Sequence, residues 1–207
     1  YLYDRNSNTI SFTYSGENLD AVTDPSGRTI LFAYDAGRIS TITDPAGNSH
    51  NFTYTDQKLT SVSSQIAAVG TRVWVYTYDD RGFMLTKQDP LGNITSYAYD
   101  TSNRITRVTD PEGRVRVLTY DPSAYRTELT EKDGGIWTYR YGSVIAGVTE
   151  KIDPLGNTTR YSYDIYGNIT SITDPMGNTT TYTYDVNGNV LTVTDPLGST
   201  TTYTYNA

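Results

Sequence analysis

Apolar and polar residues alternate along this chain in short runs that recur about every 21 residues. Each run contains an aromatic residue, one variable residue and a tyrosine, so alternation places both rings on one face of a strand. The runs are rich in Thr, Tyr, Val and Ile, which favour β-strands. The doublets are Tyr1/Tyr3, Phe12/Tyr14, Phe32/Tyr34, Phe52/Tyr54, Tyr76/Tyr78, Tyr97/Tyr99, Tyr139/Tyr141, Tyr161/Tyr163, Tyr182/Tyr184 and Tyr203/Tyr205, with Leu118/Tyr120 as a variant.

A second run in each repeat carries apolar residues at two positions before a turn aspartate. Ile39 and Ile42, which precede Asp44 by five and two residues, are an example. Because the two positions differ by three, a regular strand would place them on opposite faces. The pattern therefore allows either a β-bulge or a strand with apolar residues on both faces.

Turns with the pattern Asp-x-x-Gly separate these runs. Asp accepts hydrogen bonds from the backbone of its own turn, Pro in second place fixes φ, and Gly in fourth place adopts positive φ. Seven of the eight prolines lie in such turns, which leaves the strands free of proline, as a hydrogen-bonded sheet requires. The predicted turn residues are Asp24, Pro25, Gly27, Asp44, Pro45, Gly47, Asp89, Pro90, Gly92, Asp110, Pro111, Gly113, Asp153, Pro154, Gly156, Asp174, Pro175, Gly177, Asp195, Pro196 and Gly198.

Two strands and two turns at a fixed period predict an all-β array of tandem hairpins over residues 1–207. About 20 strands exceed the number that a twisted open sheet usually holds, so we expect a curved or spiralling antiparallel sheet. The repeat is irregular at residues 4–13, 62–72 and 121–150, and we interpret the second of these as a longer loop. The array is expected to be a fragment of a longer protein.

The composition argues against several classes of function. A net charge of −7 and a pI near 4.6 disfavour nucleic-acid binding, which needs a basic surface. The chain has no cysteine, no apolar run long enough for a membrane span, and one histidine, His50. We therefore expect no enzyme activity, no cofactor and no metal. The acidic turns could bind Ca²⁺, but each Asp more simply serves its own turn.

The second residue of each doublet forms the predicted structural ladder. We expect the rings to pack on one another and hold the sheet together. The alternative is a platform of exposed rings that stacks on sugars, and ring exposure distinguishes the two. The ladder residues are Tyr34, Tyr54, Tyr78, Tyr99, Tyr120, Tyr141, Tyr163, Tyr184 and Tyr205.

Copies such as Tyr161-Ser162-Tyr163-Asp164-Ile165-Tyr166-Gly167-Asn168 resemble the YD repeat of the Rhs (rearrangement hotspot) family, and the resemblance covers essentially the whole chain. It implies a β-strip that spirals into a hollow shell. In bacterial Rhs and toxin-complex proteins such shells enclose a toxic C-terminal domain, and in teneurins a related shell belongs to adhesion ectodomains. The residue after each Asp-Pro-x-Gly turn is Arg, Asn or Ser, never Leu, so the family's self-cleavage at Asp-Pro-x-Gly-Leu is not expected here.

The resemblance implies a structural role in a secreted or cell-surface protein of bacterial origin. The expected partners are other repeats of the parent chain and an enclosed C-terminal domain. Unpaired strand edges at Tyr1–Tyr3 and Tyr203–Tyr205 could also pair with a second copy. The alternative function is an adhesion module that binds carbohydrate or a cell surface.

Overall fold

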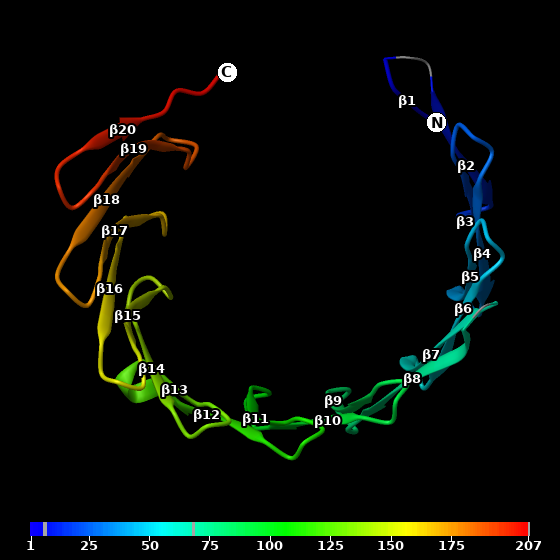
Figure 1. Ribbon diagram of the computed structural model, residues 1–207, viewed down its shortest axis with the longest axis horizontal. Coiled ribbons are helices and arrows are strands. Elements are labelled where there is room, and N and C mark those ends of the chain that lie inside the picture. Colours follow the sequence, from blue (N-terminus) through cyan, green and yellow to red (C-terminus); the bar gives the residue numbers. More distant parts are fainter. Residues whose placement is uncertain (6–7, 68, 207) are drawn as a thin grey trace. The chain divides into compact units, whose positions relative to one another are not determined.

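The computed structural model describes residues 1–5, 8–67 and 69–206. They form two compact units, Tyr1–Tyr97 and Ala98–Ala207, and the boundary falls within strand β10. The predicted all-β class is confirmed, because the described residues contain twenty strands and one short 3-10 helix. Both units are built from antiparallel hairpins (Figure 1).

Most strands are five to seven residues long. In the first unit they are β1 (Leu2–Tyr3), β2 (Thr9–Ser15), β3 (Asn18–Thr23), β4 (Thr29–Asp35), β5 (Arg38–Thr43), β6 (Ser49–Thr55), β7 (Lys58–Ile66), β8 (Gly70–Tyr78), β9 (Met84–Gln88) and the start of β10 (Ile94–Tyr99). In the second unit β10 ends, and β11 (Ile105–Thr109), β12 (Val115–Asp121), helix η1 (Pro122–Ala124), β13 (Arg126–Thr130), β14 (Ile136–Tyr141), β15 (Val148–Ile152), β16 (Thr158–Tyr163), β17 (Ile169–Thr173), β18 (Thr179–Tyr184), β19 (Val190–Thr194) and β20 (Thr200–Thr202) follow.

Within each unit a strand pairs with the strand that follows it in the chain, always antiparallel. The pairs run from β1–β2 to β9–β10 in the first unit and from β11–β12 to β19–β20 in the second. The turns are only a few residues long, and short turns can join only antiparallel neighbours. Each unit is therefore an open meander whose contacts are made between neighbouring hairpins.

A β-bulge resolves the ambiguity in the apolar pattern. Tyr34 lies opposite Ile39 and Ala33 lies opposite Thr41, so Ser40 is an extra residue without a partner. The bulge places Ile39 and Ile42 on the same face as the aromatic doublet. The same register shift recurs in six other hairpins, where the extra residue is Asp20, Thr60, Leu85, Thr149, Thr170 or Leu191.

The bulges give each unit two distinct faces. We call the face with the aromatic doublets and their apolar partners the aromatic face, and the opposite one the polar face. In β4 the aromatic-face residues Phe32 and Tyr34 are half-buried, whereas Leu31, Ala33 and Asp35 are exposed. No apolar side chain of the described residues is buried, and Ser64 is the single buried residue. Each unit is thus one layer of sheet without the second layer on which most domains build a core.

The first hairpins connect their strands by a tighter turn than the sequence predicts. Ala36 and Gly37, and likewise Asp56 and Gln57, all have positive φ, as a two-residue hairpin turn requires. These turns are one residue shorter than Asp-x-x-Gly turns such as that at Asp164. The shorter turn explains why the period is 20 residues between Tyr14, Tyr34 and Tyr54 and about 21 residues further along.

The structure explains the first irregular range, 4–13. Strand β1 pairs with β2 through Leu2–Ile10 and Tyr3–Thr9, which matches the pairing of Val22–Ile30 and Thr23–Thr29 in the next hairpin. Tyr3 therefore occupies the position of Thr23 in the apolar run β3, although the doublet Tyr1/Tyr3 has the sequence of an aromatic run such as β4. Residues 6 and 7 of this range lie outside the described residues.

The interpretation of 62–72 as a longer loop is wrong. Strands β7 and β8 extend through this range and stay paired as far as Ile66–Gly70, so the segment is a longer hairpin. Ser61 and Ser63 lie on either side of Val62, as expected for a strand with a period of two. Because the Asp-Pro turn is missing, this short pattern alone did not predict a hairpin. Residue 68 lies outside the described residues.

In the third irregular range, 121–150, the hairpin of β12 and β13 lacks the bulge, whereas the hairpin of β14 and β15 has it. In β12 and β13 Tyr120 pairs with Thr127 and Asp121 with Arg126 without a register shift. Helix η1 connects the two strands, and Tyr125 at its end adopts the left-handed conformation with φ 47° and ψ 48°. The regular geometry of the repeat is interrupted at this one hairpin of the second unit.

Candidate functional site

At least six of the nine ladder tyrosines are held by a hydrogen bond of their hydroxyl group. The Tyr184 hydroxyl donates to the Ile169 carbonyl at 2.7 Å, and Ile169 belongs to the hairpin that precedes Tyr184. This bond links successive hairpins and explains why the second doublet position is always tyrosine, whereas Phe or Leu occurs at the first. The equivalent bonds, 2.7 to 3.0 Å long, join Tyr34 to Leu19, Tyr78 to Leu59, Tyr120 to Ile105, Tyr163 to Val148 and Tyr205 to Val190.

The expected packing of ring on ring is not how these tyrosines are fixed. Tyr163 and Tyr184 lie opposite the aliphatic residues Ile169 and Val190 in the strand register. A ring pair is formed by Tyr1 and Tyr3, with centroids 6.3 Å apart, in the described part of β1. Half-buried rings with engaged hydroxyls suit a structural role better than a stacking platform for sugars.

Burial also acts on the acidity of the ladder. It raises the pKa of four phenol groups above the ordinary value of tyrosine, because the ionised form is less well solvated in the sheet. These groups belong to Tyr78, Tyr120, Tyr163 and Tyr184.

We expect Tyr184→Phe to lower the free energy of unfolding by about 1 kcal/mol, because it removes the hydroxyl and leaves the Ile169 carbonyl without its donor. Tyr182→Phe is the matched control in the same strand, and it should change stability by less than about 0.5 kcal/mol. Urea unfolding of both variants measures the difference. Equal effects of the two substitutions would contradict a role of the hydroxyl.

The Asp-x-x-Gly turns are closed by the side chain of their aspartate. Asp174 Oδ1 accepts from the backbone N–H groups of Met176 and Asn178, and Oδ2 accepts from the Asn178 side-chain amide at 2.8 Å. Two backbone bonds complete the turn, from Asp174 N–H to the Asn178 carbonyl and from Gly177 N–H to the Asp174 carbonyl. Gly177 has φ 89°, a conformation that glycine adopts without strain.

The residue after the turn glycine is a functional part of the turn that the sequence interpretation missed. It is Asn in the turns of Asp44, Asp89, Asp153, Asp164, Asp174 and Asp185, where its amide donates to the carboxylate. It is Arg in the turns of Asp24 and Asp110, where the guanidinium does the same, and in the turn of Asp100 an Arg in the same place follows Asn103 instead of glycine. The signal was present in the sequence as Asp-x-x-Gly-Asn or Asp-x-x-Gly-Arg.

These bonds lower the pKa of the turn aspartates. For Asp44 and Asp174 the largest cause is the hydrogen bond from the Asn side chain, supported by the backbone N–H groups of the turn. In Asp110 the Lys132 ammonium is the first cause, and it holds the pKa far below the usual range. Each of these carboxylates is ionised and serves as an acceptor within its own turn.

Stability should therefore fall at both ends of the pH scale. The turn aspartates have lower pKa values in the folded state, so their contribution is full above about pH 4 and is lost as the pH falls through the folded values. The ladder phenols have raised values, so their contribution is full below about pH 10 and is lost as the pH rises. Urea unfolding across this pH range measures the profile, and stability that increases towards either extreme would contradict it.

A single substitution tests the loss of stability at low pH separately. Asn178→Ala removes the first cause of the lowered Asp174 pKa, so it should reduce the loss of stability on acidification. Asn187→Ala is the control, because Asn187 uses its backbone N–H for the turn.

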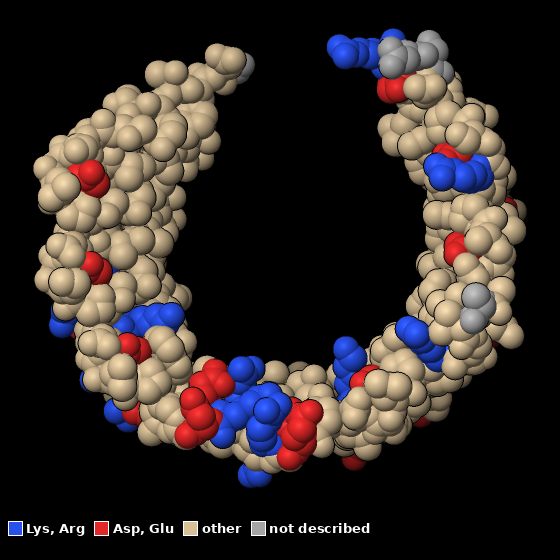
Figure 2. Space-filling model, in the orientation of Figure 1, with Lys and Arg blue, Asp and Glu red and all other residues tan. Residues whose placement is uncertain are grey.

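Many charged side chains form ion pairs, some within a turn and others between neighbouring strands. Arg114 lies 2.8 Å from Asp110, and Glu150 pairs with both Arg140 and Arg160. Figure 2 shows most basic side chains beside acidic ones on the face drawn, without a large patch of one sign. The face drawn thus lacks the large basic patch that nucleic-acid binding requires.

The residues weighed for metal binding or catalysis occupy ordinary positions in the repeat. The described residues contain no group of three His, Cys, Asp or Glu side chains placed to hold a metal ion. His50 Nδ1 lies 2.7 Å from Ser64 Oγ, a cross-strand pair between β6 and β7. Among the described residues no helix is long and apolar enough to cross a membrane.

Single-layered antiparallel hairpins with bulges, a tyrosine ladder and closed aspartate turns define a YD-repeat protein of the shell type. The chain belongs to the Teneurin YD-shell family, which matches residues 2–146. The RHS Repeat family matches the remainder in overlapping copies, at residues 146–175, 166–197 and 184–207. The resemblance expected from the sequence is thereby confirmed, and no curated protein matches the chain.

Solved structures share the fold. The crystal structure of TcdB2-TccC3 is 15% identical, covers 92% of this chain and 13% of that chain, and has a TM-score of 0.59. The structure of TcdB2-TccC3 without hypervariable C-terminal region is 15% identical, covers 92% of this chain and 12% of that chain, and has a TM-score of 0.58. The chain thus spans about an eighth of the length of these proteins.

Proposed function

We propose that this chain is a segment of the wall of a β-shell that encloses another polypeptide segment of its parent protein. The observation that carries the proposal is the single layer of sheet: no apolar side chain of the described residues is buried, yet the aromatic face is continuous within each unit. A sheet that does not cover its own apolar face gains stability when it is closed around something.

The bonding pattern suits a wall. Hydroxyl bonds such as that of Tyr163 link neighbouring hairpins at six ladder positions, and aspartate turns such as that of Asp153 connect the strands. Stability in such an array is a sum of nearest-neighbour contacts, so the wall can be extended by any number of repeats. The expected partners are accordingly further repeats of the parent chain and the enclosed segment.

The similar structures support this function by analogy of fold. One of them is described as lacking a hypervariable C-terminal region, which indicates that in that protein a variable region follows a shared part. By the same analogy we propose that the parent protein is a secreted bacterial protein of the toxin-complex type and that the enclosed segment lies C-terminal to the repeats. Association of copies through the edge strands β1 and β20 stays a prediction.

Limited proteolysis of the full-length parent protein tests the proposal. The segment that follows the repeats should be resistant in the native protein and should become sensitive when the wall is weakened by deletion of Thr170. Ser171→Ala in the same strand is the control and should leave the protection unchanged. The proposal is wrong if the segment is cut in the native protein as fast as it is cut when expressed alone.

A further inference from the structure

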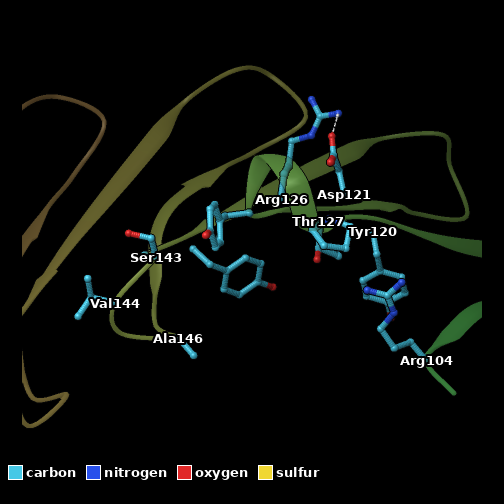
Figure 3. A pocket seen from close by; sticks show the side chains of 12 residues that line it. Arg104, Tyr120, Asp121, Arg126, Thr127, Ser143, Val144 and Ala146 are labelled. Atoms are coloured by element: carbon cyan, nitrogen blue, oxygen red, sulfur yellow. Dashed lines mark ion pairs between the residues drawn. The ribbon is translucent and has the colours of Figure 1, made fainter. Parts of the chain in front are cut away.

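The interrupted hairpin of the second unit forms an open pocket of about 390 Å³ on the sheet. Its walls come from the ladder residues Tyr120 and Tyr141, from Tyr125 after helix η1, and from the loop that contains Val144. Figure 3 shows the loop residues Ser143, Val144 and Ala146 on one side of the pocket and Arg104 with Tyr120 on the other. The volume lies at the small end of the range for ligand pockets, about 300–1,000 Å³.

The pocket exists because one side chain of the repeat is missing. Opposite the second aromatic residue, the other hairpins with a defined register carry an aliphatic residue, as in Tyr163–Ile169 and Tyr184–Val190. The same holds for the partners of Tyr14, Tyr34, Tyr54, Tyr78 and Tyr141, which are Leu19, Ile39, Leu59, Met84 and Val148. Opposite Tyr120 the chain places Thr127. A larger side chain fills this space in the other hairpins, and here the space is open. A side chain from another segment would therefore fit into it.

Arg104 makes this site suitable for an aromatic ring. Its guanidinium lies over the Tyr120 ring, 4.3 Å from the centroid, and is held there by Asp100 Oδ2 at 2.8 Å. The side chain is 38% exposed, so the stack of ring and guanidinium is open to a further partner. Arginine stacks on aromatic faces through its planar guanidinium. Because Asp100 compensates the charge of Arg104, an uncharged ligand fits this position.

Tyr125 supplies a second, independent observation. A bulky residue in the left-handed conformation is strained, and its φ of 47° directs the chain from η1 into β13 at the rim of the pocket. Tyr125 is 51% exposed and lies outside the ladder. The exposed ring of Tyr125 lies beside the pocket, where it can contact a ligand.

We propose that this pocket binds an aromatic side chain that another polypeptide segment presents. The ring enters between the Tyr125 and Tyr141 walls and stacks against the guanidinium of Arg104, in the space left by Thr127. A charged ligand would fit this site less well, because the charge of Arg104 is already compensated by Asp100.

The probe is N-acetyl-tryptophanamide, an aromatic side chain flanked by peptide groups, titrated into the ¹⁵N-labelled chain and followed by NMR. We expect amide signals around Tyr125 and Tyr141 to shift with a Kd of about 1 mM, and N-acetyl-leucinamide to bind about tenfold more weakly. Both experiments use the intact chain and need no enclosed segment, so their outcome is independent of the shell function.

Two variants remove the site without endangering the fold. Thr127→Ile restores the aliphatic residue of the regular repeat and fills the pocket, and Tyr125→Gly relieves the backbone strain while deleting one wall. Each should weaken binding of N-acetyl-tryptophanamide about tenfold. The matched controls are Thr181→Ile on the polar face and Tyr166→Gly, the other tyrosine outside the ladder. Absence of binding, equal binding of the leucine compound, or equal weakening by the controls would overturn the proposal.

Discussion

Deletion of Thr170 is expected to lower the free energy of unfolding of the second unit by about 1–2 kcal/mol. Thr170 is the extra residue of the bulge between β16 and β17, where Ser162 pairs with Ser171 and Tyr163 with Ile169. Without it, Ile169 and Ile172 are two positions apart and stay on one face of a regular strand, so the expected cost comes from the loss of the bulge and of the local twist that it adds. The carbonyl that accepts from the Tyr184 hydroxyl is displaced as well.

The side chain of Thr170 should matter much less than its presence in the backbone. Thr170→Ala is therefore the control, with an expected change of less than about 0.5 kcal/mol. The chain has two tryptophans, one in each unit, so a Trp74→Phe background leaves Trp137 as the fluorescent reporter of the second unit. A deletion that costs no more than the alanine substitution would show that the bulge does not position the Ile169 carbonyl for the Tyr184 hydroxyl.

Gly147→Ala is expected to destabilise the second unit by about 1–3 kcal/mol, the usual cost of an extra carbon in a filled space. A Cβ at Gly147 would lie 2.8 Å from Cζ of the Tyr163 ring and 3.0 Å from a neighbouring ring carbon. The ring has little freedom to move away, because its hydroxyl donates to the Val148 carbonyl at 2.8 Å. Urea unfolding followed by Trp137 fluorescence measures the effect.

A double-mutant cycle distinguishes this clash from a general effect on the loop. Tyr163→Leu removes the ring, so Gly147→Ala should cost much less in that background. Ser143→Ala in the same loop is the control and should be nearly neutral. Additive effects of Gly147→Ala and Tyr163→Leu would contradict a direct contact between Gly147 and the ring.

The sequence was sufficient for the features that depend on local chemistry. Turns such as Asp174-Pro175-Met176-Gly177 can be predicted because Pro and Gly have strong backbone preferences. The strands between the turns can be predicted from the period of two in their apolar residues. The Asn or Arg that follows most turn glycines was equally visible, but its role depends on a side-chain bond that the sequence pattern alone does not reveal.

Features that depend on neighbouring strands could not be predicted in the same way. The spacing of Ile39 and Ile42 is compatible with a bulge or with two apolar faces, and only the register of Tyr34 with Ile39 decides. The hydroxyl bond of Tyr34 reaches Leu19, fifteen residues earlier, although the exclusion of Phe from this position was a signal of it.

Single departures from the repeat were the least predictable. The segment from Ser64 to Gly70 was misread as a loop because it has no Asp-Pro turn, yet the strands continue. The range 121–150 was recognised as irregular, but the left-handed Tyr125 and the pocket beside it occur once, so no repeated pattern could point to them.

Electron cryo-microscopy of the full-length parent protein tests the wall function most directly. We predict that residues 1–207 form part of a continuous single-layered wall and that density for another segment of the chain fills the interior. A strip that projects freely into solvent, or one that is covered by a second sheet with no enclosed segment, would contradict the account.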